Sequence, residues 1–174
     1  MITNFLITGA RGAGKSTLVR RIEQAIHLPC AGFRTLPQEH YDCGNTYNLT
    51  DLTTGETAPI STWDGQAFRP VEATFLDLGV RCLNEARTGS SPLLILDELG
   101  RFERRCTPFL RSVETVLDSD KTVLAVLKKE PIDFIDRIRA RADCRVFDLD
   151  SLCRDAIFPE LAALVSFSVE KNAK

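Results

Sequence analysis

The sequence has no excess of positive charge, because 24 acidic residues outnumber 22 lysines and arginines and leave a formal net charge of -2. A protein that binds duplex nucleic acid through its phosphates needs a strongly basic surface, so we expect no nucleic-acid partner. Histidine is also scarce, with two residues, and no C-x-x-C pair accompanies a histidine at zinc-ligand spacing. The sequence therefore predicts no zinc site.

Paired cysteines and long apolar runs are missing too. The six cysteines are scattered, without a C-x-x-C pair, which favours single buried thiols in a reducing compartment over a disulfide framework. No apolar run approaches the length of a membrane span, and residues 1–8 lack the basic and apolar regions of a signal peptide. We therefore expect a cytoplasmic protein that does not associate with membranes.

Short apolar runs alternate with segments of helical periodicity along the chain. Runs typical of strands buried on both faces of a sheet occur at 4–8, 93–96 and 122–127. Apolar side chains at helical spacing occur at 16–27, 71–87 and 107–117, before a further helix (132–141), a strand (145–147) and a helical tail. This order predicts an α/β fold, a three-layer sandwich around a mostly parallel, doubly wound sheet.

One stretch has a different composition. Residues 31–62 are rich in Gly, Thr, Asn and Pro, with short β-prone runs on either side of the turn-forming segment 53–56. We expect a small antiparallel hairpin, at about 36–62, that is inserted into the sheet or caps it. No linker, repeat or low-complexity segment interrupts the chain, so residues 1–174 are predicted to form a single domain.

Residues 9–16 match the phosphate-binding pattern G-x-x-x-x-G-K-[ST] at every fixed position, between a predicted strand and a predicted helix. The glycines let backbone N–H groups approach phosphate oxygens, and the helix directs the positive end of its dipole at them. Lys15 is predicted to contact the β- and γ-phosphates of a nucleoside triphosphate, and the Ser16 hydroxyl to bind Mg²⁺. The expected nucleotide-binding residues are Gly9, Ala10, Arg11, Gly12, Ala13, Gly14, Lys15, Ser16 and Thr17.

Two adjacent acids, Asp97 and Glu98, follow the apolar run 93–96. We expect that run to form a strand beside the strand of residues 4–8, which would place Asp97 near the phosphate-binding loop as a ligand of Mg²⁺. Glu98 then points in another direction and is predicted to act as the general base that polarises a water molecule. Lys15 and Glu98 are therefore the candidate catalytic residues.

At these motifs the chain resembles the small P-loop nucleoside-triphosphatases typified by the thermophile enzymes and the human cancer-related nucleoside-triphosphatase. The resemblance rests on residues 9–17, on Gly32–Phe33–Arg34–Thr35, placed as the family's Gly-Phe-x-Thr, and on residues 97–103, which are similar to its Asp-Glu-Ile-Gly-Lys-Met-Glu. Cys153–Arg154–Asp155 is similar to a late Asn-Arg-Asp element. The resemblance covers about residues 3–155 and implies Mg²⁺-dependent hydrolysis of nucleoside triphosphates, ATP and GTP among them, with relaxed base preference.

Four arginines are further candidates. Arg34 and Arg101 are expected near the phosphate end of the sheet, where an arginine can stabilise charge on the transferred phosphoryl group; a surface ion pair is the alternative for each. Arg137 and Arg141 lie four residues apart and would either form part of a lid or belong to a solvated helix face.

Two other pairs of residues have a functional and a structural interpretation. Lys128 and Lys129 follow a predicted strand at its carboxyl end, where one of them would face the ligand. Trp63 and Phe68 follow the predicted hairpin and either stack on a base or pack against the sheet.

Hydrolysis is the leading interpretation of the function, because Glu98 supplies a base for water. Small-molecule and nucleotide kinases are the main alternative on the same fold, and residues 35–62 would then bind the phosphoryl acceptor. A third interpretation is a nucleotide-dependent switch with slow hydrolysis and a protein partner. The sequence does not indicate which base is preferred.

Overall fold

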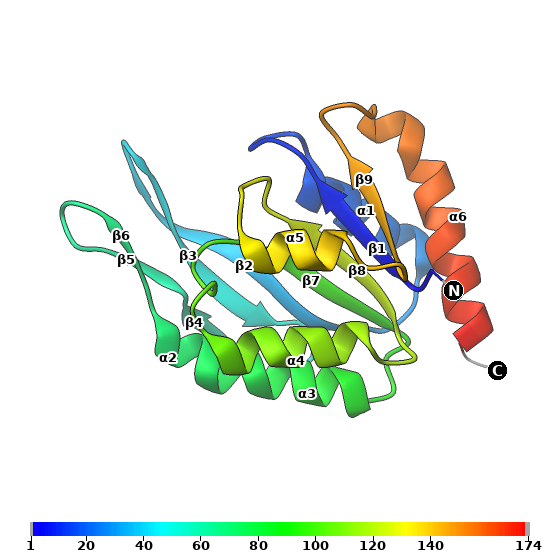
Figure 1. The fold of residues 1–174 in the computed structure, drawn as a ribbon, viewed down its shortest axis with the longest axis horizontal. Helices are drawn as coiled ribbons and strands as arrows, with labels where there is room; N and C mark the ends of the chain where they lie inside the picture. Colours follow the sequence, from blue (N-terminus) through cyan, green and yellow to red (C-terminus); the bar gives the residue numbers. More distant parts are fainter. Residues whose placement is uncertain (1, 173–174) are drawn as a thin grey trace.

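In the computed structural model, which describes residues 2–172, a seven-stranded sheet lies between two layers of helices (Figure 1). The strand order is β4-β3-β2-β7-β8-β1-β9, and no helix of the described residues is long and apolar enough to cross a membrane. The strands of this sheet are β1 (Asn4–Thr8), β2 (Cys30–Tyr41), β3 (Gly44–Asp51), β4 (Thr57–Pro59), β7 (Leu93–Leu99), β8 (Thr122–Leu127) and β9 (Cys144–Asp148). The helical segments are α1 (Lys15–Ile26), α2 (Glu72–Thr74), the π-helical η1 (Phe75–Gly79), α3 (Val80–Thr88), α4 (Thr107–Leu117), α5 (Asp133–Arg139) and α6 (Arg154–Asn172).

The strands β2, β7, β8, β1 and β9 are parallel, which confirms the predicted α/β class with its mostly parallel sheet. The predicted position of β7 beside β1 is wrong, because β8 lies between them. Every residue of β8 is buried, and such a strand suits the centre of a sheet that helices cover on both faces. At the level of the sheet, Asp97 and the phosphate-binding loop are therefore separated by the width of one strand.

Each face of the sheet carries its own hydrophobic core. On one face, α3, α4 and α5 cover a cluster that includes Phe33, Phe75 and Phe109. The ring centroid of Phe109 lies 5.7 Å from that of Phe33 and 5.1 Å from that of Phe75. On the other face, α1 and α6 contribute Leu18 and Leu161 to a second cluster. The two cores fix the carboxyl ends of the parallel strands, from which the loops of the candidate site extend.

The predicted antiparallel hairpin is present, but it begins earlier than expected and a second hairpin follows it. β2 starts at Cys30 as a parallel partner of β7 and continues as the antiparallel partner of β3. The strands β5 (Ser61–Trp63) and β6 (Phe68–Pro70) form a separate two-stranded ribbon that we did not predict. The rings of Tyr41, Trp63 and Phe68 pack together between the hairpins, with the centroids of Trp63 and Phe68 4.8 Å apart.

Glu103, in the loop between β7 and α4, is turned into the protein. Its side chain is 3 % exposed, and its Oε1 accepts a hydrogen bond from the backbone N–H of Gly100. Because burial disfavours the charged form, the pKa of Glu103 is raised to about 7. An acid that titrates near neutral pH thus lies beneath the loop of residues 101–105.

We expect Glu103 to lower the stability of the folded protein as the pH rises. The pKa of Glu103 lies above its ordinary value of 4.5 in the folded state, so its contribution to stability is complete below that value and is lost as the pH rises through about 7. Ionisation in the folded state costs roughly 3 kcal/mol. Glu103→Gln keeps an acceptor for Gly100 without the charge, and should remove most of this loss. Urea unfolding of the original chain and of the Glu103→Gln variant at about pH 5 and pH 8 measures this loss of stability. If the free energy of unfolding fell equally in both chains between the two pH values, the assignment to Glu103 would be wrong.

Candidate functional site

The phosphate-binding loop, residues 9–14, connects the end of β1 to the start of α1. Gly14, the residue before the helix, has a φ of 87°, a left-handed conformation that glycine adopts without strain. A Cβ atom at this position would lie 3.0 Å from Cδ and Nη1 of Arg154, so glycine also leaves room for that side chain. The loop and the first turn of α1 can therefore direct backbone N–H groups at an anion.

Lys15 begins α1, and its ammonium group lies inside the loop. Its Nζ donates hydrogen bonds to the carbonyl oxygens of Gly9 (2.9 Å) and Ala10 (3.0 Å). The same atom lies 3.7 Å from Oε2 of Glu98. The structure therefore places the two predicted catalytic side chains in one ion pair at the end of the loop.

Ser16 and Asp97 meet despite the strand between β1 and β7. Ser16 Oγ donates a hydrogen bond of 2.9 Å to Oδ1 of Asp97, which is 1 % exposed. The other carboxylate oxygen, Oδ2, has no hydrogen-bond partner among the described residues, and Arg34 Nε lies 3.6 Å from it. Burial raises the pKa of Asp97, while the Ser16 hydroxyl and the charge of Arg34 act in the opposite direction. A buried carboxylate with a free oxygen, next to a hydroxyl, can bind a hard cation.

This set of oxygen atoms fits Mg²⁺. Within residues 2–172 there is no group of three or more His, Cys, Asp or Glu side chains that could hold a metal ion. Mg²⁺ does not need one, because it is usually bound through one or two protein oxygens while water and substrate phosphates complete its shell. Ser16 and Asp97 supply two such oxygens, so the site suits a cation that binds together with a phosphate substrate.

Glu98 is half-buried beside Asp97, and β2 holds its backbone. Its N–H donates a hydrogen bond of 3.3 Å to Oγ1 of Thr35. Burial raises the pKa of Glu98, and the charges of Lys15 and Lys128 lower it. A carboxylate whose pKa is raised accepts a proton more readily than an exposed one, which is what a general base for water requires.

A cavity of about 690 Å³ lies over the phosphate-binding loop, and we call it the loop cavity. Besides the loop it is lined by Thr35, Glu98, Lys128 and Lys129, so both lysines after β8 face it. Its volume is within the range of cavities that bind small ligands. Its positive side chains suit a polyanion such as a triphosphate.

Asp150, which no motif indicated, ties the loop to the segment after β9. Its Oδ1 accepts a hydrogen bond of 2.8 Å from the backbone N–H of Ala10. Lys129 Nζ lies 2.7 Å from Oδ2 of Asp150 and 2.8 Å from Oδ2 of Asp148. The only signal in the sequence was the position of these acids at the carboxyl end of a predicted strand.

Two of the four candidate arginines lie near the loop cavity. Arg101 lines the cavity. Arg34 pairs with Glu23 of α1 and lies 3.6 Å from Asp97, so its charge is directed at protein carboxylates.

The other two arginines lie away from the loop cavity. Arg137 is 65 % exposed and pairs with Glu114 of α4. Arg141 pairs with Asp143, which also accepts a hydrogen bond from the side chain of Asn4, the first residue of β1. Because the phosphate-binding loop follows the other end of β1, Arg141 lies at the opposite edge of the sheet. This placement argues against a lid formed by these two side chains.

Several known proteins are similar to this chain over most of their length. A family model described as NTPase matches residues 4–162. The nucleoside-triphosphatase THEP1 of Thermotoga petrophila is 30% identical over 174 residues, which cover 96% of this chain and 95% of that protein. The cancer-related nucleoside-triphosphatase homolog of Mus musculus is 26% identical over 190 residues, which cover 97% of this chain and 99% of that protein.

Two solved structures share the fold. The crystal structure of THEP1 from Aquifex aeolicus superimposes with a TM-score of 0.75 at 23% identity, covering 93% of this chain and 98% of that one. The solution structure of a human cancer-related nucleoside triphosphatase gives a TM-score of 0.71 at 22% identity, covering 95% of this chain and 98% of that one. The order of strands and helices described above is therefore a known arrangement.

Proposed function

Because the chain belongs to the NTPase family and is thus a P-loop nucleoside-triphosphatase, we propose that its loop cavity hydrolyses ATP, GTP and other nucleoside triphosphates with Mg²⁺. The observation that supports this mechanism is the distance of 3.7 Å between Lys15 Nζ and Glu98 Oε2. An ammonium group for phosphate and a carboxylate for water then face the same cavity, as hydrolysis of a triphosphate requires.

In the proposed reaction, a water oxygen attacks the γ-phosphorus, the bond to the bridging oxygen breaks, and nucleoside diphosphate and phosphate are released. Glu98 accepts the proton of the attacking water. Lys15 and the backbone N–H groups of the loop stabilise the negative charge on the phosphate oxygens. The hydrogen bonds from Lys15 to the carbonyl oxygens of Gly9 and Ala10 orient the ammonium group for this role.

Ser16 and Asp97 are the residues proposed to hold Mg²⁺. The ion, when bound, offsets the charge of the β- and γ-phosphates. Arg34 lies 3.6 Å from Asp97 and favours its ionised form, so we assign Arg34 a positioning role rather than a contact with the transferred phosphoryl group.

Replacing Asp97 by asparagine is expected to raise the Mg²⁺ concentration needed for half-maximal activity by about 10–100-fold. Asparagine keeps an acceptor for the Ser16 hydroxyl but removes the negative charge that attracts the cation. Phosphate release at fixed ATP over a range of Mg²⁺ concentrations measures the change. Asp120→Asn, at an exposed position, serves as the control. An unchanged Mg²⁺ requirement in the Asp97 variant would remove Asp97 from the metal site.

The proposed activity is tested by phosphate release from ATP, GTP, CTP, UTP and inosine triphosphate with Mg²⁺, with and without phosphoryl acceptors. Release in the absence of any acceptor is expected for a hydrolase. Release that occurs only with an added nucleoside, nucleotide or small alcohol would identify a kinase instead.

The six cysteines are all free thiols, which supports our proposal that the enzyme is located in the reducing cytoplasm.

A further inference from the structure

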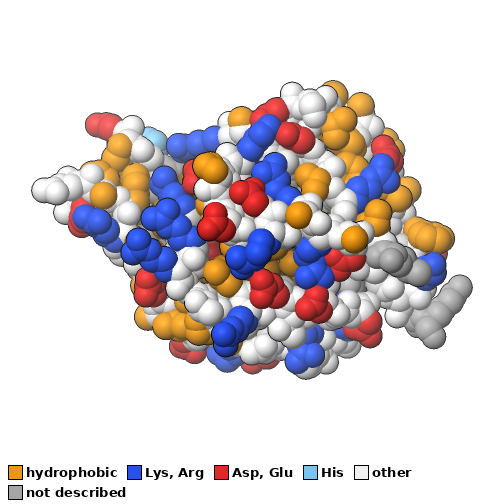
Figure 2. All heavy atoms as spheres, in the orientation of Figure 1, with side chains coloured by type: hydrophobic (Ala, Val, Ile, Leu, Met, Phe, Trp, Pro, Cys, Tyr) orange, Lys and Arg blue, Asp and Glu red, His pale blue; other side chains and the backbone are white. Residues whose placement is uncertain are grey.

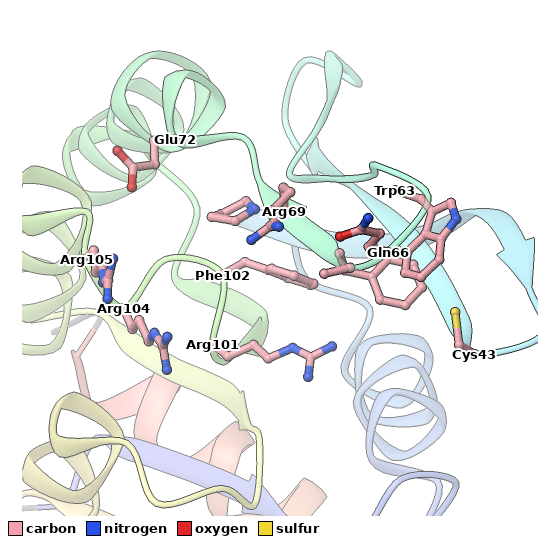
Figure 3. Close-up of a pocket in the computed structure, with 12 residues that line it drawn as sticks. Cys43, Trp63, Gln66, Arg69, Glu72, Arg101, Phe102, Arg104 and Arg105 are labelled. Atoms are coloured by element: carbon pink, nitrogen blue, oxygen red, sulfur yellow. The ribbon is translucent and has the colours of Figure 1, made fainter.

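A second cavity, of about 760 Å³, lies between the β5–β6 hairpin and the loop of residues 101–105 (Figure 3). Cys43, Phe68 and Arg101 line both this cavity and the loop cavity, so the two are neighbours. We call it the arginine cavity, after four of the residues that line it: Arg69, Arg101, Arg104 and Arg105.

Three of these arginines carry charge that the protein does not neutralise. Arg101, Arg104 and Arg105 are exposed and form no ion pair with a carboxylate of residues 2–172. Glu103 interrupts this run in the sequence, but its side chain points into the core and Glu72 is the one carboxylate among the residues that line the cavity. Figure 2 shows lysine and arginine side chains gathered at this end of the molecule, near the β5–β6 hairpin.

Aromatic side chains form another part of the wall. Trp63, Phe68 and Phe102 all line the cavity and are half-buried, so each keeps part of its ring accessible. In Figure 3, Trp63 and Gln66 project from the hairpin, opposite the loop that carries Phe102. Flat apolar rings beside unpaired guanidinium groups match a ligand that has both a planar base and a phosphate.

The two cavities are each large enough for one ligand. Small-molecule cavities commonly measure about 300–1,000 Å³, and the loop cavity at about 690 Å³ and the arginine cavity at about 760 Å³ each fall within this range. The arginine cavity adjoins the loop cavity at Arg101, which lines both cavities and does not belong to the phosphate-binding loop.

We propose that the arginine cavity binds a second nucleotide, a nucleoside monophosphate, next to the triphosphate site. Arg104 and Arg105 bind its phosphate, because planar guanidinium groups form paired hydrogen bonds with phosphate oxygens. Trp63 stacks on its base, and Gln66 offers an amide to the edge of the base. This proposal extends the proposed function to a second ligand but does not depend on hydrolysis.

Trp63 is the single tryptophan of the chain, so its fluorescence reports directly on the arginine cavity. The experiment titrates AMP, GMP, CMP or UMP into the full chain while Mg²⁺ and a non-hydrolysable β,γ-imido analogue of ATP fill the loop cavity. We expect saturable quenching by the monophosphates, weaker binding of ribose 5-phosphate and inorganic phosphate, and a Kd raised about tenfold or more by Arg104→Gln combined with Arg105→Gln. Arg111→Gln, an exposed arginine of α4, is the matched control and should leave the Kd unchanged.

Five results would overturn the proposal. The monophosphates do not quench Trp63, or the ATP analogue displaces them in competition, which would place them in the loop cavity. The two arginine substitutions weaken binding of the ATP analogue itself, which would assign the arginine cavity to the base of the triphosphate. Single-stranded RNA binds where monophosphates do not, or inorganic phosphate binds as tightly as they do.

This titration is independent of turnover. A chain that binds monophosphates at Trp63 without releasing phosphate from any triphosphate would support the second site and contradict the proposed hydrolysis. A chain that hydrolyses triphosphates but whose Trp63 fluorescence is not quenched by monophosphates would support the proposed hydrolysis and contradict the second site.

Discussion

Replacing Glu98 by glutamine is expected to lower the rate of phosphate release by about 10²–10⁴-fold, while triphosphate binding stays measurable. Glutamine has the shape of glutamate but cannot accept the proton of the attacking water. The hydrogen bonds from Lys15 to Gly9 and Ala10 do not involve Glu98, so the phosphate contacts should survive. A titration with a fluorescent triphosphate and a phosphate-release assay on the same preparation measure the two effects.

The control for this substitution is Glu114→Gln. Glu114 lies on α4 and pairs with Arg137 outside the loop cavity, so its loss should leave turnover as it is. Unchanged turnover in the Glu98 variant would instead show that another group takes the proton. Glu130, which also lines the loop cavity, would then be the next residue to test.

Replacing Gly32 by alanine is expected to lower the free energy of unfolding by about 3–5 kcal/mol, because strain and overlap add. Gly32 has a φ of 101°, a conformation that L side chains rarely adopt. A Cβ atom there would lie 2.2 Å from the carbonyl oxygen of Ile95, its partner on β7. The backbone of β2 would have to move away from the strand that carries Asp97 and Glu98, so urea unfolding and phosphate release should both be affected.

Gly55→Ala is the matched control for Gly32→Ala. Gly55 also has a positive φ, of 75°, but no atom lies within 4 Å of the position of its Cβ. Alanine at this turn should cost only the strain of the left-handed conformation, about 1–2 kcal/mol. Equal losses of stability in the two variants would mean that the approach of Gly32 to β7 is unimportant.

The predictable part of the site was the part that is continuous in sequence. Residues 9–14 lie between β1 and α1 and residues 15–17 form the first turn of α1, as their motif requires, and the apolar runs of β7 and β8 form buried strands. The order of those strands could not be predicted, because both runs satisfy the same pattern and packing alone decides which one is central. Asp97 nevertheless accepts a hydrogen bond from Ser16, the second residue of α1.

The remaining parts of the site depend on contacts between distant segments. β5 and β6 have three residues each, too few to show an alternation. Asp150 acts on a residue 140 positions away, Ala10. Helical spacing suggested a role for Arg137, but α5 buries Phe134 and Ile138 and leaves that arginine exposed and outside the lining of the loop cavity.

The packing of α6 against α1 has a consequence for the synthesis of the protein. Leu18 of this helix shares its hydrophobic cluster with Leu161 of α6, and β9 joins the sheet beside β1. The ribosome therefore completes the phosphate-binding loop long before it delivers residues 154–172. During that interval the sheet can cover part of the apolar face of α1, but the part that meets α6 is uncovered and open to chaperones.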